Sequence, residues 1–170
     1  MFDKVNQALD FLSRGREVLD FWKKNDIFKK SLTLRDGAER FTFYDGPPTA
    51  NGKPHIGHVL TRAMKDLIPR YQVMKGKNVL RKAGWDTHGL PTARLVLKEL
   101  GDRRRGLSDY ELREICREYA LKYEDVQRQQ FVRLGSLGDY ADPSLTLSAY
   151  FVAQQIAGFG GMADKGFFYQ

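Results

Sequence analysis

Apolar residues recur at steps of three or four positions in several stretches of the chain, which is the spacing of one face of a helix. The first stretch ends near Trp22, and the others cover 59–74, a long segment after Ser108, and roughly 149–164. We therefore expect a helix in each of these stretches. The chain also becomes helical and charged after Pro91.

Specific residues mark where two of these helices begin and end. Ser108 followed by Glu111 has the capping-box spacing of a helix start. Gly76 predicts the end of the helix over 59–74, and Pro69 inside it predicts a kink. One apolar face of that helix is made by Leu60, Met64, Leu67, Ile68 and Tyr71.

Alternating and β-rich segments predict the strands. We expect one strand over 40–44 and a short one over 78–83, an extended segment over 27–34, and a loop over 135–143. Strand, glycine-rich loop, helix and strand form a βαβ unit, whose strands are parallel. The pattern therefore predicts an α/β fold with flanking helices.

Bulky apolar residues outside these faces are candidates for the core. We assign Trp85 and Leu90 to it, and Cys116 as an inert thiol on the apolar face of its helix. The last helix is expected to direct three side chains inward, those of Val152, Ile156 and Phe159.

Composition narrows the class of protein. The chain has 170 residues, 42% of them apolar, and 28 basic against 21 acidic residues give a net charge of +7. These values suit one folded domain and permit, without requiring, a nucleic-acid or phosphate ligand. The single cysteine excludes an internal disulfide and a cysteine-rich zinc site. Because the chain has neither a bilayer-length apolar run nor a signal-peptide core, we expect a cytoplasmic protein with no membrane partner.

Proline and histidine are concentrated in one part of the chain. Five of the six prolines and all three histidines fall between residues 47 and 91. Within it, residues 44–58 join the end of a predicted strand to the start of a predicted helix, where parallel sheets bind ligands and a helix offers unpaired N–H groups. His55 and His58 at that point can donate hydrogen bonds to phosphate oxygens, and Gly57 between them leaves a flat backbone.

Each part of this loop also has an ordinary structural interpretation. Residues 46–48 fit a rigid loop, Lys53 fits a solvated charge, and His55 with His58 fits a surface or capping pair. For metal binding, no cysteine and no further histidine at suitable spacing completes the ligand set. The loop is neither a Walker loop nor the Gly-x-Gly-x-x-Gly fingerprint.

The combination is more specific than its parts. The segment from Pro54 to His58 resembles the HIGH signature of class I aminoacyl-tRNA synthetases, and residues 44–52 resemble its isoleucine-specific form. The block at 84–91, Gly-Trp-Asp-Thr-His-Gly-Leu-Pro, again resembles isoleucyl-tRNA synthetases. The resemblance continues to residues 165–169, so it covers nearly the whole chain. Its HIGH-motif region comprises Pro48, Thr49, Ala50, Asn51, Gly52, Lys53, Pro54, His55, Ile56, Gly57 and His58.

The resemblance implies a fold and a reaction. The fold is the first half of a Rossmann-type catalytic domain over 40–170, preceded by a helix and lead-in over 1–39. The reaction is activation of isoleucine with ATP and Mg²⁺ to isoleucyl-adenylate, followed by transfer to tRNA(Ile) in the full-length enzyme. The resemblance further implies that Gln170 stops near the editing-domain insertion, and it supports no zinc within this chain.

The resemblance also implies residue roles. His55 and His58 are the catalytic candidates, and ATP contacts fall to these two residues with Asn51, Lys53 and Gly57. Gly46, Pro47 and Asp86 are the candidates for amino-acid binding, with Asp86 holding the substrate ammonium. The alternative for Asp86 is a helix N-cap or a surface acid.

Departures and alternatives remain beside the family assignment. Thr92-Ala93-Arg94 replaces the Val-Glu or Ile-Glu that the family usually has after Gly-Leu-Pro. One alternative is a free-standing ATP- or RNA-binding module of synthetase origin without ligase activity. Another is a different nucleotidyltransferase, against which the block at 84–91 argues. The run Arg103-Arg104-Arg105 fits a solvated face better than a tRNA contact.

Overall fold

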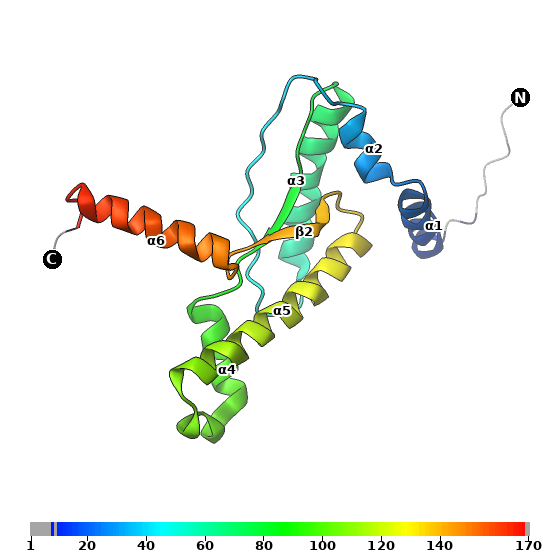
Figure 1. Ribbon diagram of the computed structural model, residues 1–170. Coiled ribbons are helices and arrows are strands. Elements are labelled where there is room, and N and C mark those ends of the chain that lie inside the picture. Colours follow the sequence, from blue (N-terminus) through cyan, green and yellow to red (C-terminus); the bar gives the residue numbers. More distant parts are fainter. Residues whose placement is uncertain (1–7, 9, 169–170) are drawn as a thin grey trace, which may run out of the picture.

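The computed structural model describes residue 8 and residues 10–168, which form helices around a small parallel sheet (Figure 1). The elements in chain order are α1 (Phe11–Lys24), α2 (Ile27–Thr33), α3 (Ile56–Met74), β1 (Lys82–Trp85), α4 (Leu90–Leu100), a 3₁₀ helix η1 (Gly101–Gly106), α5 (Asp109–Arg133), β2 (Asp139–Leu145) and α6 (Ala149–Asp164). The α/β fold with parallel strands and flanking helices is thereby confirmed.

Side-chain caps start several helices, and the one at Ser108 is the cap that the sequence predicts. Asp10 accepts hydrogen bonds from the N–H groups of Leu12 and Ser13 and so starts α1. The capping box of α5 is confirmed, because the Ser108 N–H donates to the Glu111 carboxylate at 2.8 Å and the Glu111 N–H donates back to the Ser108 hydroxyl. The predicted first helix is confirmed over 11–24, whereas residues 8 and 10 are not helical, so the helix begins later than its apolar pattern from Val5 predicts; residues 1–7 and 9 lie outside the described part.

The segment over 27–34 is a helix, so the predicted extended segment is wrong. Its half-buried residues, Ile27, Phe28, Ser31 and Leu32, have helical spacing, which the sequence interpretation missed. The guanidinium of Arg81 lies 4.8 Å from the Phe28 ring centroid and donates to the Ser31 hydroxyl. Packing against Arg81 therefore fixes the buried side of α2.

The sheet differs from the predicted one in its strands. The predicted strand over 40–44 is wrong, because within it only Arg40 is paired, in an isolated parallel bridge with Asn78. The second predicted strand begins later, at β1. Residues 139–145 form β2 instead of the predicted loop.

The two strands approach closely because of a glycine. Lys82 pairs with Asp139, Gly84 with Ser144 and Trp85 with Leu145, all in parallel. A Cβ on Gly84 would lie 3.1 Å from the Ser144 carbonyl oxygen, closer than ordinary contacts allow. The glycine thus permits the pairing that places Trp85 under α5.

The core is centred on Trp85. Its ring stacks on that of Phe131 at a centroid distance of 6.4 Å and meets that of Tyr140 at 6.2 Å. Ala50 and Ala120 complete the buried cluster. The assignment of Trp85 to the core is confirmed, whereas that of Leu90 is wrong, because its side chain is 76% exposed at the start of α4.

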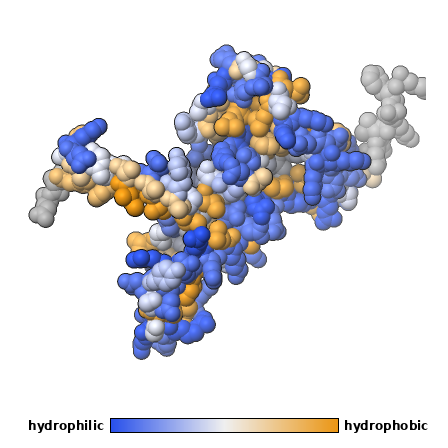
Figure 2. All heavy atoms as spheres, viewed as in Figure 1, coloured by the Kyte–Doolittle hydropathy of each residue, from blue (hydrophilic) through white to orange (hydrophobic). Residues whose placement is uncertain are grey.

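Two helices present apolar surface to solvent. The predicted inward packing of α6 is wrong, since it extends away from the other elements (Figure 1) and even Phe159 is 62% exposed. Figure 2 shows hydrophobic atoms along this helix. On α3, the predicted apolar face exists but is largely exposed, as at Leu60, Met64 and Leu67. Within residues 8 and 10–168, no helix combines the length and the apolar character that crossing a membrane requires.

Candidate functional site

The loop over 46–55 ends at His55, the residue that precedes α3. Backbone hydrogen bonds hold it against Asp86, the residue that follows β1. The Ala50 N–H donates to the Asp86 carbonyl at 2.8 Å, and the Asp86 N–H donates to the Pro48 carbonyl at 2.9 Å. These bonds bring the two sequence motifs, residues 48–58 and 84–91, into one place.

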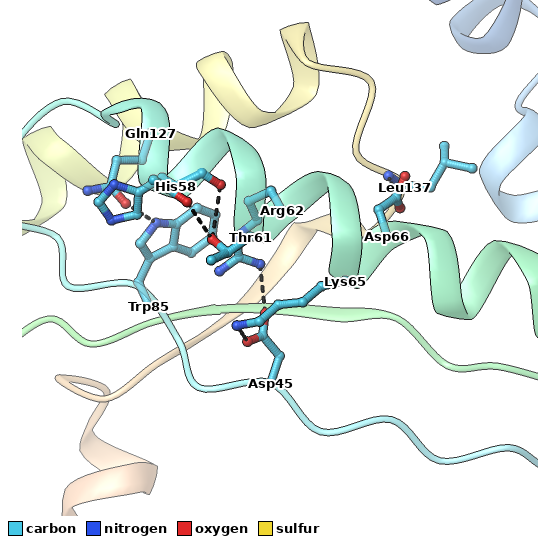
Figure 3. A network of polar contacts seen from close by, with 10 residues as sticks. Asp45, His58, Thr61, Arg62, Lys65, Asp66, Trp85, Gln127 and Leu137 are labelled. Carbon is cyan, nitrogen blue, oxygen red and sulfur yellow. Dashed lines mark hydrogen bonds and ion pairs between the residues drawn. The ribbon is translucent and has the colours of Figure 1, made fainter.

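Charged side chains of α3 hold the start of the loop. The Arg62 guanidinium lies 3.0 Å from the Asp45 carboxylate, which also accepts from the Lys65 ammonium (Figure 3). Arg62 in turn lies over the Phe131 ring, 5.0 Å from its centroid. Asp45 thereby ties the loop to both α3 and α5.

His55 and His58 form a capping box at the start of α3. The His55 Nδ1 accepts from the Gly57 N–H at 3.1 Å, and the His58 Nδ1 accepts from the His55 N–H at 3.3 Å. The two rings lie 4.0 Å apart. A nitrogen that accepts carries no proton, so a neutral ring in this arrangement has its proton on Nε2. The capping role leaves both Nε2–H groups available as donors.

The electrostatic surroundings favour the neutral form of His58. Partial burial lowers the pKa of His58 below its usual value of 6.5, and the nearby His55 and Arg62 add to the effect. The ring is therefore a neutral donor near pH 7.

Gly57 is required by the same capping geometry. A Cβ at this position would lie 2.9 Å from Cε1 of His55. Any larger residue would displace the His55 ring from its cap, which agrees with the flat backbone expected from the sequence.

On the other side of the loop, Asp86 is half-buried and caps no described helix, because Gly89 precedes α4. The Thr146 hydroxyl lies 3.5 Å from the Asp86 Oδ1 and accepts from the Thr87 N–H at 2.9 Å. The N-cap alternative for Asp86 is thereby excluded. Its carboxylate has capacity to accept further hydrogen bonds.

The remaining candidates lie along the loop. Gly46, Pro47 and Lys53 are exposed, whereas Asn51 is half-buried and its carbonyl accepts from the Tyr119 hydroxyl at 3.4 Å. Burial raises the pKa of Tyr119 to about 12, so its hydroxyl keeps the donated proton. His88, to which the sequence analysis assigns no role, is exposed.

A cavity of about 710 Å³ lies beside the loop. Pro47, Arg62, Gly84 and Trp85 are among its lining residues. His55, His58 and Asp86 are not among its lining residues, so the cavity adjoins the candidate site without containing these polar groups.

Sequence reasoning missed one buried residue that touches both motifs. Gln127 on α5 accepts from the Trp85 indole N–H at 3.0 Å (Figure 3). It also donates to two loop carbonyls, those of Thr49 and Gly52. The signal was present in the sequence, because Gln127 lies at helical spacing from Ala120 and Phe131 and is a polar residue on a buried face.

Metal ligands are not gathered in the described part of the chain. No group of three or more His, Cys, Asp or Glu residues within 8 and 10–168 is placed to hold an ion. Cys116 is half-buried, and burial raises the pKa of its thiol, which agrees with the inert thiol expected from the sequence.

Two comparisons with known proteins agree on the family. The model of the family described as tRNA synthetases class I (I, L, M and V) matches residues 17–170. Isoleucine--tRNA ligases of Caldicellulosiruptor saccharolyticus and Clostridium tetani are 46% and 48% identical over 92% and 86% of this chain. The chain spans only 17% and 14% of those two proteins.

A solved structure shares the fold. It is a LeuRS chain in a ternary complex described as LeuRS-tRNA-LeuAMS, from Agrobacterium radiobacter. The TM-score is 0.72 at 24% identity, and the match covers 95% of this chain and 19% of that one.

Proposed function

Since this chain belongs to the class I tRNA synthetases (I, L, M and V), we propose that it is a segment of an isoleucine--tRNA ligase and supplies the nucleotide-binding loop of its adenylation site. The observation that carries the proposal is the capping box of His55 and His58, which uses both Nδ1 atoms and leaves both Nε2–H groups free at a helix N-terminus.

The proposed reaction joins isoleucine to ATP. A carboxylate oxygen of isoleucine attacks the α-phosphorus, and the bond from this phosphorus to the bridging oxygen breaks. Pyrophosphate leaves, and isoleucyl-adenylate remains for transfer to tRNA(Ile). No side chain forms a covalent bond, so the protein contributes position and stabilisation of negative charge.

The start of α3 suits the phosphates. Helix N-termini carry partial positive charge and unpaired N–H groups. The Nε2–H groups of His55 and His58 add two donors in the same region, and Lys53 and the Asn51 side chain adjoin them along the loop. Neutral donors keep the rings in their capping arrangement while they bind an anion.

Asp86 suits the ammonium of isoleucine. It lies beside Pro48 through paired backbone hydrogen bonds, and Gly46 and Pro47 precede that point. This arrangement supports an aliphatic pocket beside a carboxylate. A pocket of this kind distinguishes isoleucine from valine by about 1–3 kcal/mol, because the two differ by one methylene.

The first experiment is calorimetric titration of the chain with ATP and Mg²⁺. We expect weak binding, because the chain spans 17% of a curated relative and offers one loop of the nucleotide site. Replacing His55 and His58 together by Ala should abolish it. Low-micromolar affinity of the unmodified chain would contradict a partial site, and unchanged affinity in the double variant would remove the histidines from it.

A further inference from the structure

Gln127 occupies a buried position where its side-chain amide is fully hydrogen-bonded. The residue is 1% exposed. Its Oε1 accepts from the Trp85 Nε1–H at 3.0 Å, and its Nε2 donates to the Thr49 carbonyl at 2.9 Å and to the Gly52 carbonyl at 2.8 Å. One side chain of α5 thus joins β1 to two points of the loop.

Those contacts lie next to both halves of the candidate site. Trp85 immediately precedes Asp86, and Gly52 lies three residues before His55, where α3 is capped. Residues 49–52 are also held by the backbone bridge between Thr49 and Asp86 and by the longer hydrogen bond from the Tyr119 hydroxyl. Two side chains of α5 thus hold the loop, and Gln127 makes the two shorter hydrogen bonds.

A second residue of α5, Phe131, supports the contacts that Gln127 makes with the loop. Phe131, one helical turn beyond Gln127, stacks on the Trp85 ring and lies under Arg62, which pairs with Asp45 at the other end of the loop. Both ends of the loop are thus connected to the same face of α5, one through Gln127 and the other through Arg62 and Phe131.

We infer that Gln127 is a positioning residue that sets the loop carrying His55 and His58 in register with Asp86, so that nucleotide and amino acid meet in the proposed function. Because the side chain must accept once and donate twice, glutamate cannot replace it. An ionised carboxylate still accepts from Trp85 but donates to neither loop carbonyl.

The test compares Gln127→Glu with Gln130→Glu in the full chain. Both variants make the same chemical change on α5, but no hydrogen bond of the Gln130 side chain to the loop is found. Amide hydrogen exchange across 45–60 and MgATP affinity by NMR titration are measured for both. Urea denaturation reports any global loss of stability.

In Gln127→Glu we expect loop amides to exchange at least about tenfold faster, beyond any change at core amides of α5. We also expect MgATP affinity to fall at least about fivefold, since the misplaced loop no longer aligns its donors. Gln130→Glu should leave both values within about twofold. Lowering the pH should narrow the difference in loop protection between Gln127→Glu and the unmodified chain measured at the same pH, because a protonated carboxyl regains one donor.

Two results overturn the inference. One is unchanged loop exchange in Gln127→Glu, and the other is faster exchange with unchanged MgATP affinity, which would leave Gln127 a structural role only. If the variant does not fold, side-chain amide signals of Gln127 in the unmodified chain decide, since rapid exchange of its two protons contradicts the double donation. Absence of MgATP binding by the unmodified chain overturns the proposed function, while the exchange comparison still shows whether Gln127 holds the loop.

Discussion

At the scale of the residue, the candidate site depends on which atom of each side chain is already engaged. The Nδ1 atoms of His55 and His58 each accept a hydrogen bond from a backbone N–H. Gly57, which has no Cβ, leaves the space that this arrangement needs. The structural and functional interpretations of the histidine pair therefore do not compete. Capping through Nδ1 determines that a neutral ring carries its proton on Nε2. The Nε2–H group is then the one that can donate to a phosphate.

Asp86 provides a residue-scale test of the amino-acid half of the site. In a full-length ligase that contains this segment, Asp86→Asn should lower isoleucine-dependent pyrophosphate exchange at least about tenfold. A lost charge-assisted contact costs about 1.5–3 kcal/mol. Most of the loss should fall on isoleucine affinity, and ATP affinity should stay nearly unchanged because the proposed phosphate contacts lie at His55 and His58, at the other end of the loop.

The measurement separates two explanations for such a loss. Equal weakening of ATP and isoleucine would show that Asp86 acts on the loop as a whole, through the hydrogen bonds near Pro48 and Thr146. Intact isoleucine activation would remove Asp86 from the site altogether.

At the scale of the element, the start of α3 should respond to pH. The folded-state pKa of His58 lies below the unfolded value of 6.5, so the unfolded chain binds more protons in this range. The free energy of unfolding therefore rises with pH between the folded-state pKa of His58 and about 6.5. This contribution is lost as the pH falls from about 6.5 toward the folded-state pKa. Protonation of Nδ1 would also break the bond from the His55 N–H.

Urea denaturation between about pH 7.5 and 5.5, with the His58→Gln variant as control, measures this effect. The variant cannot titrate at this position, so the stability difference between it and the unmodified chain should shrink as the pH falls. An imidazole NMR titration that places the folded-state pKa of His58 above 6.5 would contradict the sign.

Elements differed in how far the sequence predicted them. The helix α5 and its capping box follow from local spacing alone, as does the end of α3 at Gly76, whose φ of 91° suits glycine. The helix α2 and the strand β2 were missed. The buried side of α2 is defined by a distant partner, Arg81, and β2 is a strand because β1 pairs with it.

At the scale of the whole molecule, the core is small and centred on the Trp85 and Phe131 rings. Phe131→Ala should destabilise the chain by about 3–5 kcal/mol, because it leaves a cavity against Trp85. That is a large part of the stability of an ordinary domain, about 5–15 kcal/mol.

The exposed Leu90 is the matched comparison. Leu90→Ala should change the free energy of unfolding by no more than about 0.5 kcal/mol, because its side chain is 76% exposed. Urea denaturation of both variants measures the two values. A large loss of unfolding free energy in Leu90→Ala would show that Leu90 belongs to the core. A small loss in Phe131→Ala would show that the core does not depend on Phe131.

The sequence by itself determined the family, the loop and the helix that begins at it, because these depend on local spacing and on a motif whose residues are consecutive. It also placed His55, His58 and Asp86 as candidates, although their roles remain proposals. The tertiary structure alone decided that 40–44 is not a strand, that Leu90 and α6 are exposed, and that Gln127 joins the two motifs. Burial and strand pairing depend on contacts between segments that are distant in the sequence. A local pattern cannot specify which distant segment packs against it or pairs with it.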